Sequence, residues 1–186
     1  MQKNLILRIS LILVALSVIH CKQFYRNQET KIEFSLDTID SRFVLNKSDK
    51  IRLVYFGFLS CPDACPTTFQ IIAQSMKTLR EEERSKVEIL FIDIDSKRDT
   101  LPQIKKYVDH FYPGIIPLSG TQDELQKVAK QFNAFFMEVP IESEMKYTMD
   151  HSTRVYVIDR DNYLIDSIPH NIPIEVFTQY IRKNLN

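Results

Sequence analysis

The sequence predicts an α/β domain with a central mixed sheet flanked by helices and an extra N-terminal hairpin. Apolar runs of strand length alternate with segments whose apolar residues recur at helical spacing. Near the end of the chain, two strand-like segments joined by a tight turn precede a last helical segment. The 186 residues, of which 44% are hydrophobic, suffice for one well-packed domain and are too few to predict two.

The first elements are the hairpin, the central strand and the first helix. Ile32–Asp37 alternates apolar and polar residues, as a half-exposed strand does, and we expect it to pair with Arg42–Leu45. Ile51–Phe58 is rich in aromatic and branched residues, which predicts a strand buried on both faces. Pro66 fits a first helical turn because it lacks an N–H and fixes φ, and the helix is predicted to reach about Arg84.

The middle of the chain repeats this alternation of strand and helix. Val87–Ile94 predicts a second buried strand, and the apolar spacing in Leu101–Phe111 predicts a helix. Ile115–Leu118 predicts a short strand, and Thr121-Gln122-Asp123-Glu124 predicts a capping box at the start of the next helix.

The last third of the chain completes the sheet. Phe135–Val139 and Met145–Met149 are expected to form the arms of an irregular hairpin. Arg154–Ile158 and Tyr163–Ser167 flank a tight Asp/Asn turn and give the clearest hairpin signal, and the last helix is predicted from about Pro173 to Asn186. Strands that alternate with helices and then end in a hairpin and a helix indicate a thioredoxin-like α/β fold.

Residues 1–21 have the pattern of a targeting segment. Two basic residues, Lys3 and Arg8, precede an apolar core at Ile9–Ile19 that is too short to span a membrane comfortably, and Cys21 follows. This layout resembles a bacterial lipoprotein signal, in which Cys21 would become the lipidated first residue. An uncleaved membrane anchor and plain secretion are the alternatives.

Each of these alternatives predicts a domain outside the cytoplasm, on the periplasmic side and attached to a membrane or close to it. Residues 22–31 are expected to be a tether, and residues 32–186 the folded domain. Thiols tend to oxidise outside the cytoplasm, so a working thiol pair there needs a reductant, and we expect a thioredoxin-like partner.

The charge balance argues against a nucleic-acid partner. Lysine plus arginine and aspartate plus glutamate both number 24, so the formal net charge is zero at pH 7. We find no basic stripe with interleaved aromatic residues, and we therefore expect no binding to nucleic acid.

Two cysteines, Cys61 and Cys65, lie where the central strand gives way to a helix. The positive end of the helix dipole lowers the pKa of thiols placed there, which favours thiolates. Three residues separate them, one more than in a thioredoxin-type redox pair, and this spacing allows either a disulfide or two ligands to one metal ion. The pair alone does not decide between redox and metal chemistry.

Among the four histidines, His151 is the candidate for a third ligand. It lies directly before a predicted core strand, and in a thioredoxin-like sheet the segment that enters that strand faces the thiol loop. The neighbouring Asp150 could orient the imidazole ring from outside the coordination sphere, or it could simply tighten the turn.

These motifs resemble the Sco/SenC family of copper-binding proteins, in the family's order and over most of residues 32–186. The matching stretches are Tyr55-Phe56-Gly57-Phe58, Cys61-Pro62-Asp63-Ala64-Cys65-Pro66, Ile94-Asp95 with Arg98-Asp99-Thr100, and Asp150-His151-Ser152. The resemblance implies copper held by Cys61, Cys65 and His151, with a supporting carboxylate at Asp95. It also implies delivery of copper to, or reduction of, the dinuclear copper site (CuA) of cytochrome c oxidase subunit II.

The three side chains suit copper on chemical grounds. Thiolates are soft ligands that select Cu(I), and an imidazole extends the site to Cu(II). Three ligands leave an open face for transfer between proteins, whereas a structural zinc site usually closes with four, and zinc is the alternative metal.

Two functions follow, and whether the protein is an enzyme stays open between them. A redox-active copper metallochaperone needs His151, whereas an extracytoplasmic thiol-disulfide oxidoreductase acting on a partner's cysteines needs only Cys61 and Cys65. A thiol peroxidase is a third, weaker alternative, because nothing in the sequence fixes an arginine and a hydroxyl on the reactive sulfur.

Overall fold

The computed structural model describes residues 30–185, and the chain from Lys31 onward forms one compact unit. The predicted targeting segment, the candidate lipidation residue Cys21 and most of the predicted tether lie outside the described residues. Within residues 30–185, no helix combines the length and the apolar character needed to cross a membrane.

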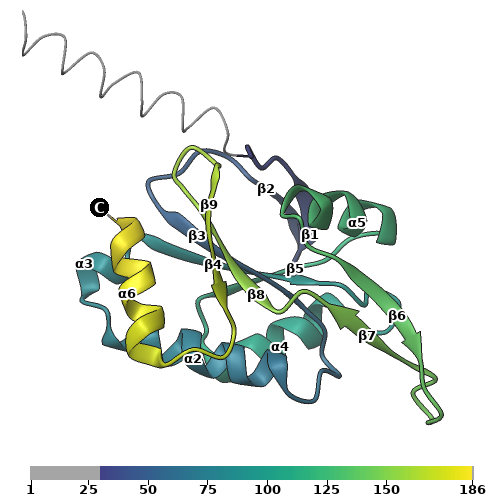
Figure 1. Cartoon of the computed structure of the whole chain (residues 1–186). Coiled ribbons are helices and arrows are strands. Elements are labelled where there is room, and N and C mark those ends of the chain that lie inside the picture. The colour runs from purple at the N-terminus through teal and green to yellow at the C-terminus, as the bar shows by residue number, and fades with distance from the viewer. Residues whose placement is uncertain (1–29, 186) are drawn as a thin grey trace, which may run out of the picture. The chain divides into compact units, whose positions relative to one another are not determined.

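A five-stranded mixed sheet organises the fold. Its strands are β3 (Ile51–Gly57), β4 (Val87–Asp93), β5 (Ile115–Leu118), β8 (Arg154–Ile158) and β9 (Leu164–Pro169). They lie in the order β5-β4-β3-β8-β9, with β3, β4 and β5 parallel and β8 antiparallel to both of its neighbours (Figure 1). The predicted central strand is therefore confirmed as the middle of the sheet.

Helices cover both faces of the sheet, and each face has its own hydrophobic core. The helices are α2 (Ala64–Thr78), α4 (Leu101–Phe111) and α6 (Ile174–Leu185) on one face, and α5 (Gln122–Gln131) on the other (Figure 1). Successive side chains of a strand point to opposite faces. Tyr55 accordingly joins the core under α2, whereas Phe56 joins the core under α5.

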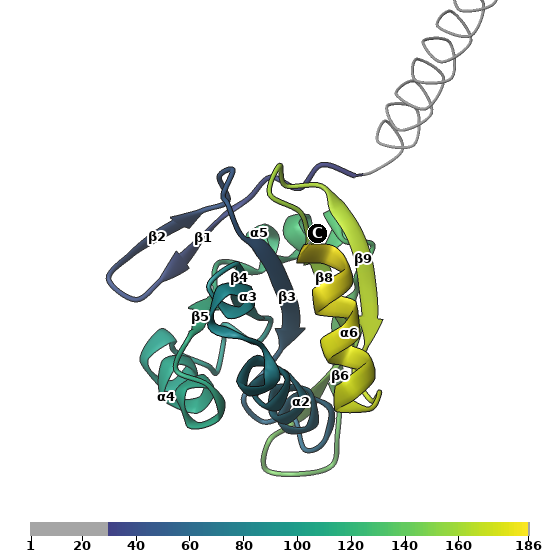
Figure 2. The same ribbon diagram turned by 90° about the vertical axis from the view of Figure 1, so that its left-hand side faces the viewer.

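Two hairpins lie outside the central sheet. The predicted N-terminal hairpin forms from β1 (Ser35–Thr38) and β2 (Ser41–Val44), and Figure 2 shows it extending away from the sheet. The second hairpin consists of β6 (Phe136–Pro140) and β7 (Tyr147–His151). His151 is the last residue of β7, so this hairpin carries the candidate imidazole.

The prediction of a single helix from Pro66 to about Arg84 is wrong. The helix α2 begins two residues earlier, at Ala64, and a separate short helix, α3 (Glu81–Arg84), follows it. The break lies at Leu79, which adopts extended backbone angles and is only 3% exposed. The Glu83 carboxylate accepts a hydrogen bond from the Arg80 backbone N–H, and this capping box starts the new helix α3, a start that the continuing apolar spacing does not reveal.

Candidate metal centre

The thiol loop joins β3 to α2 and holds the two cysteines at different depths. Cys61 is half-buried, whereas Cys65 is fully buried as the second residue of α2. The Cys61 Sγ accepts a hydrogen bond from the Cys65 backbone N–H at 3.4 Å. This N–H is one of the donors that a helix leaves unpaired at its first turn, so the start of α2 supplies a donor to sulfur.

Close packing around Cys65 requires the glycine of the preceding strand. A Cβ atom on Gly57 would lie 2.5 Å from the Cys65 Sγ, closer than such atoms approach in real structures. Any other residue at this position would displace the sulfur. The glycine therefore lets β3 pass directly beneath the buried thiol.

Three potential ligand atoms meet at this loop. The sulfurs of Cys61 and Cys65 and a ring nitrogen of His151 all lie within 4.8 Å of one another, and both cysteines are free thiols. Two ligand atoms that each lie about 2.3 Å from one ion are at most roughly 4.6 Å apart, so the three side chains need only a small adjustment to share an ion. The fold thus brings together the three residues that the sequence analysis selected.

The two thiols have opposite ionisation tendencies. A hydrogen bond from the Cys65 thiol, reinforced by the backbone N–H groups of Cys65 and Asp63, lowers the pKa of Cys61 well below its ordinary value. The same hydrogen bond, together with burial and the nearby Cys61 charge, raises the pKa of Cys65. Near neutral pH, Cys61 is therefore a thiolate and Cys65 keeps its proton.

His151 is held in a tautomer that leaves one ring nitrogen available to a metal. Its side chain is 8% exposed, and its Nδ1 lies 2.9 Å from the backbone oxygen of Ser152. A carbonyl oxygen only accepts hydrogen bonds, so Nδ1 carries the proton and Nε2 keeps its lone pair for a ligand. Edge-to-face contacts with Phe58 and Tyr55, at 5.8 and 6.3 Å between ring centroids, fix the plane of the imidazole.

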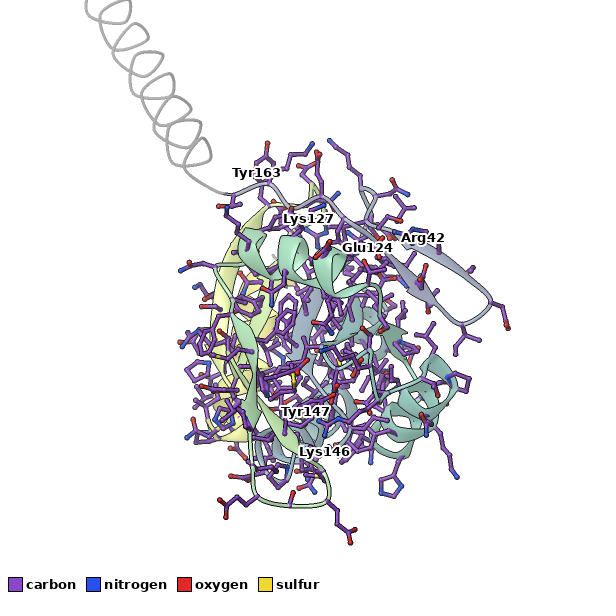
Figure 3. All side chains as sticks on the ribbon, turned by 90° about the vertical axis from the view of Figure 1, so that its right-hand side faces the viewer. Arg42, Glu124, Lys127, Lys146, Tyr147 and Tyr163 are labelled. Carbon is purple, nitrogen blue, oxygen red and sulfur yellow. The ribbon has the colours of Figure 1, made fainter. Side chains whose placement is uncertain are left out.

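Asp95 supports the strand that carries His151 and has no direct place among the ligand atoms. Its buried carboxylate accepts hydrogen bonds from the Tyr147 hydroxyl at 2.8 Å and from the Arg98 Nε at 2.6 Å. The Arg98 guanidinium lies 3.8 Å from the centre of the Tyr147 ring and donates to the Tyr147 carbonyl at 2.9 Å. Figure 3 labels Tyr147, the first residue of β7. These contacts fix the start of β7, four residues before His151.

Asp150, the other predicted supporting carboxylate, lies on the exposed side of the hairpin. It is solvent-exposed and stands opposite Met137 in the β6–β7 register, whereas His151 stands opposite the buried Phe136. The alternation of side chains along β7 thus sends Asp150 and His151 to opposite faces.

Two aspartates near the thiol loop were missed by the sequence analysis. The Asp99 carboxylate accepts a hydrogen bond from the Leu59 backbone N–H at 2.8 Å and so anchors the loop that carries Cys61. Asp93 is fully buried at the end of β4, and neither of its oxygens has a hydrogen-bond partner. Asp93 directly precedes the Ile94-Asp95 motif and Asp99 is part of the Arg98-Asp99-Thr100 motif, but sequence alone does not distinguish an anchoring carboxylate from an unpaired one.

A family model described as SCO1/SenC matches residues 24–186. The chain belongs to the SCO1/SenC family. The family resemblance inferred from the cysteine and histidine motifs is therefore confirmed.

Proteins related to this SCO1/SenC chain include both bacterial and mitochondrial sequences. A SCO2-like protein from Rickettsia conorii is 35% identical over 151 residues, which cover 75% of this chain and 72% of that protein. The mitochondrial protein SCO2 of Saccharomyces cerevisiae is 32% identical over 141 residues, which cover 75% of this chain and 47% of the yeast protein. This chain therefore matches about half the length of the yeast protein.

Solved structures of Sco proteins share the fold of this SCO1/SenC chain. Arabidopsis thaliana ScoI, solved with copper bound, is 29% identical with a TM-score of 0.76, and the match covers 84% of this chain and 98% of that one. Yeast Sco1, also solved with copper bound, is 28% identical with a TM-score of 0.76, and the match covers 84% of this chain and 88% of that one. The predicted thioredoxin-like fold is thus confirmed.

Proposed function

We propose that this SCO1/SenC protein binds one copper ion through Cys61, Cys65 and His151 and serves in the assembly of cytochrome c oxidase. The observation that carries the proposal is the approach of the three ligand atoms to within 4.8 Å of one another. Copper in the Arabidopsis and yeast relatives supports the choice of metal. The donor set supports it independently, because two thiolates select a soft ion.

The site suits a cargo ion better than a permanent structural one. Among residues 30–185, the group of potential ligands consists of Cys61, Cys65 and His151, which leaves one side of a four-coordinate ion open. An open side allows a ligand from a partner protein to bind before the first protein lets go. We propose that this partner is cytochrome c oxidase subunit II at its CuA site.

Oxidation of the thiols would control loading. The Cys61 thiolate and the Cys65 thiol form a disulfide by losing two electrons and one proton, and no thiolate pair then remains for the metal. An acceptor disulfide on a partner takes up the electrons, and a thioredoxin-like reductant returns them. The protein would therefore load copper when reduced and would be empty when oxidised.

A thiol-disulfide oxidoreductase is the second candidate function, and the ionisation of the two thiols favours it. The half-buried Cys61 has a lowered pKa and is therefore a nucleophile, whereas the buried Cys65 keeps a proton and is suited to resolve a mixed disulfide. In that function the His151 imidazole is not needed as a ligand. The two functions differ in their need for the imidazole as a ligand.

Copper titration of the reduced chain tests the proposed function. We use a Cys21→Ser background, so that Cys61 and Cys65 are the only thiols, and measure copper stoichiometry and Cu(I) affinity by competition with a chelator. One ion should bind, and Cys61→Ala, Cys65→Ala and His151→Ala should each weaken binding by at least about a hundredfold, because each removes a ligand.

The histidine control separates the two candidate functions. His110 is exposed on α4, and His110→Ala should bind copper like the parent chain. Copper affinity that is unchanged in the His151 variant would contradict the chaperone proposal. If that variant also reduced a partner disulfide at the parent rate, the oxidoreductase would be the better account.

A further inference from the structure

The hydroxyl of Tyr55 is buried beside the metal centre without a hydrogen-bond partner. The tyrosine lies on β3, its side chain is 1% exposed, and its Oη is among the buried polar atoms that make no hydrogen bond. Buried polar groups are nearly always paired, so an unpaired hydroxyl at this position needs an explanation.

The phenol and the Cys65 sulfur border the same small space above Gly57. A Cβ atom built on Gly57 would lie 2.5 Å from the Cys65 Sγ and 3.3 Å from Cε1 of the Tyr55 ring. The glycine thus allows sulfur and ring to approach each other over the bare backbone of β3. A tyrosine two residues before the glycine points to the same face of the sheet, so this proximity follows from strand geometry.

The other polar groups near the phenol already have partners. The Thr68 hydroxyl donates to the Ala64 carbonyl at 2.7 Å, and the Nδ1 of His151 pairs with the Ser152 carbonyl. A tyrosine hydroxyl carries its proton near neutral pH, so Tyr55 is a hydrogen-bond donor. The Cys65 sulfur is the neighbouring acceptor, and metal loading would convert it from a thiol to a thiolate.

We propose that Tyr55 is a positioning residue of the metal centre, whose hydroxyl donates a hydrogen bond to the Cys65 sulfur when that sulfur is a metal-bound thiolate. This inference rests on the proposed copper function. A neutral thiol is a weak acceptor and a thiolate a strong one, so the hydroxyl gains its partner only in the loaded state.

The buried position of Cys65 explains why such a donor matters. Metal loading removes the Cys65 proton and leaves negative charge on a sulfur with no exposure to water. The Tyr55 ring lies beside this sulfur over Gly57, so its hydroxyl is a nearby unpaired donor. Cys61, by contrast, is half-buried and has backbone donors from the start of α2.

The substitution Tyr55→Phe removes one oxygen and keeps the aromatic packing. The ring meets Phe69 and His151 edge to face, at 5.7 and 6.3 Å between centroids, and phenylalanine preserves both contacts. A hydrogen bond to a charged group corresponds to about a tenfold change in affinity, so we expect Cu(I) to bind about tenfold more weakly. The sulfur-to-Cu(II) absorption band should move to lower energy, because a sulfur without the donor holds its electrons less tightly.

Tyr156→Phe is the matched control, since it removes a hydroxyl from another buried tyrosine of the same sheet. Tyr156 is 4% exposed and packs against Phe56 and Phe132 in the opposite core. Both variants are made in the full chain with Cys21→Ser. Cu(I) competition, the Cu(II) absorption spectrum and the melting temperature of the metal-free protein are measured for each.

The proposal requires weaker Cu(I) binding and the spectral shift in Tyr55→Phe, with neither change in Tyr156→Phe. If Tyr55→Phe lowered only the metal-free melting temperature, or bound copper with parent affinity and spectrum, Tyr55 would have no role at the metal. If the parent chain itself failed to bind copper, the proposed function would fail first, and the Tyr55 role with it.

Discussion

At the scale of single residues, hydrogen bonds and burial together determine what each polar side chain of the centre does. Cys61 and Cys65 are chemically identical, yet the half-buried sulfur is a thiolate and the buried one keeps its proton. The His151 imidazole has one nitrogen committed to a carbonyl and the other left for a ligand. The Asp93 carboxyl is buried with no donor to its oxygens, so its charged form is unfavourable.

We predict that Asp93→Asn makes the metal-free protein more stable than the parent chain, by an amount that grows with pH. Burial, reinforced by the nearby Asp99, raises the pKa of Asp93 from 3.8 to about 9. Between these values the folded state holds a proton that the unfolded state releases, so the Asp93 contribution to stability falls as pH rises from about 4 to about 9. The asparagine side chain does not titrate, so the stability of Asp93→Asn relative to the parent chain should increase by roughly 1.4 kcal/mol per pH unit across this range.

Urea unfolding of the metal-free protein at pH 5 and pH 8 measures this difference. Asp49→Asn is the control, because Asp49 is exposed and should change stability little at either pH. An Asp93→Asn advantage that is equal at the two pH values would show that Asp93 is ionised in the folded state.

At the scale of elements, the β6–β7 hairpin positions one of the three potential ligands. The first residue of β7, Tyr147, is hydrogen-bonded to Asp95 and Arg98 in the loop after β4. The last residue of β7, His151, lies beside the two sulfurs. One end of the five-residue strand β7 is therefore held by the loop after β4, and the other end lies at the metal centre. Loss of the Tyr147–Asp95 hydrogen bond should make the His151 imidazole more mobile without altering any ligand atom.

We predict that Tyr147→Phe speeds amide hydrogen exchange in the β6–β7 hairpin and weakens Cu(I) binding less than His151→Ala does. The change leaves one oxygen of a buried carboxylate without its donor, which costs about 1–3 kcal/mol of stability. Tyr180→Phe on α6 lies outside the hairpin and should leave exchange there unchanged. Exchange and copper affinity that match the parent chain would show that Arg98 alone holds Asp95 and the strand.

At the scale of the whole molecule, the elements that sequence predicts well are those fixed by local pattern. β3 is a continuous apolar run buried along its whole length, and the capping box at Thr121 begins α5 as expected. The break between α2 and α3 was not predicted, because the apolar spacing continues through Leu79, which is buried although its backbone is extended. Cysteine spacing identified two potential ligands directly.

The rest of the centre depends on contacts between distant parts of the chain. The position of His151 relative to the thiols could be inferred only by assuming the sheet order, which the β3–β8 pairing then supplied. The opposite pKa shifts of the cysteines, the Asp95–Tyr147 bond and the unpaired Tyr55 hydroxyl all arise from packing. Local sequence patterns do not predict such packing.

We predict that the mature chain begins at a lipid-modified Cys21, which would determine where this centre works. Residues 22–31 would then be the whole tether, and ten residues reach at most about 35 Å, so the metal centre would act close to the membrane surface. Mass spectrometry of the membrane fraction should find a chain that lacks residues 1–20 and carries added lipid, and Cys21→Ser should abolish both changes. A membrane-bound chain that retains residues 1–20 would instead indicate an uncleaved anchor. A cleaved chain without lipid in the soluble fraction would indicate secretion, and the reach of the copper site would then have no such limit.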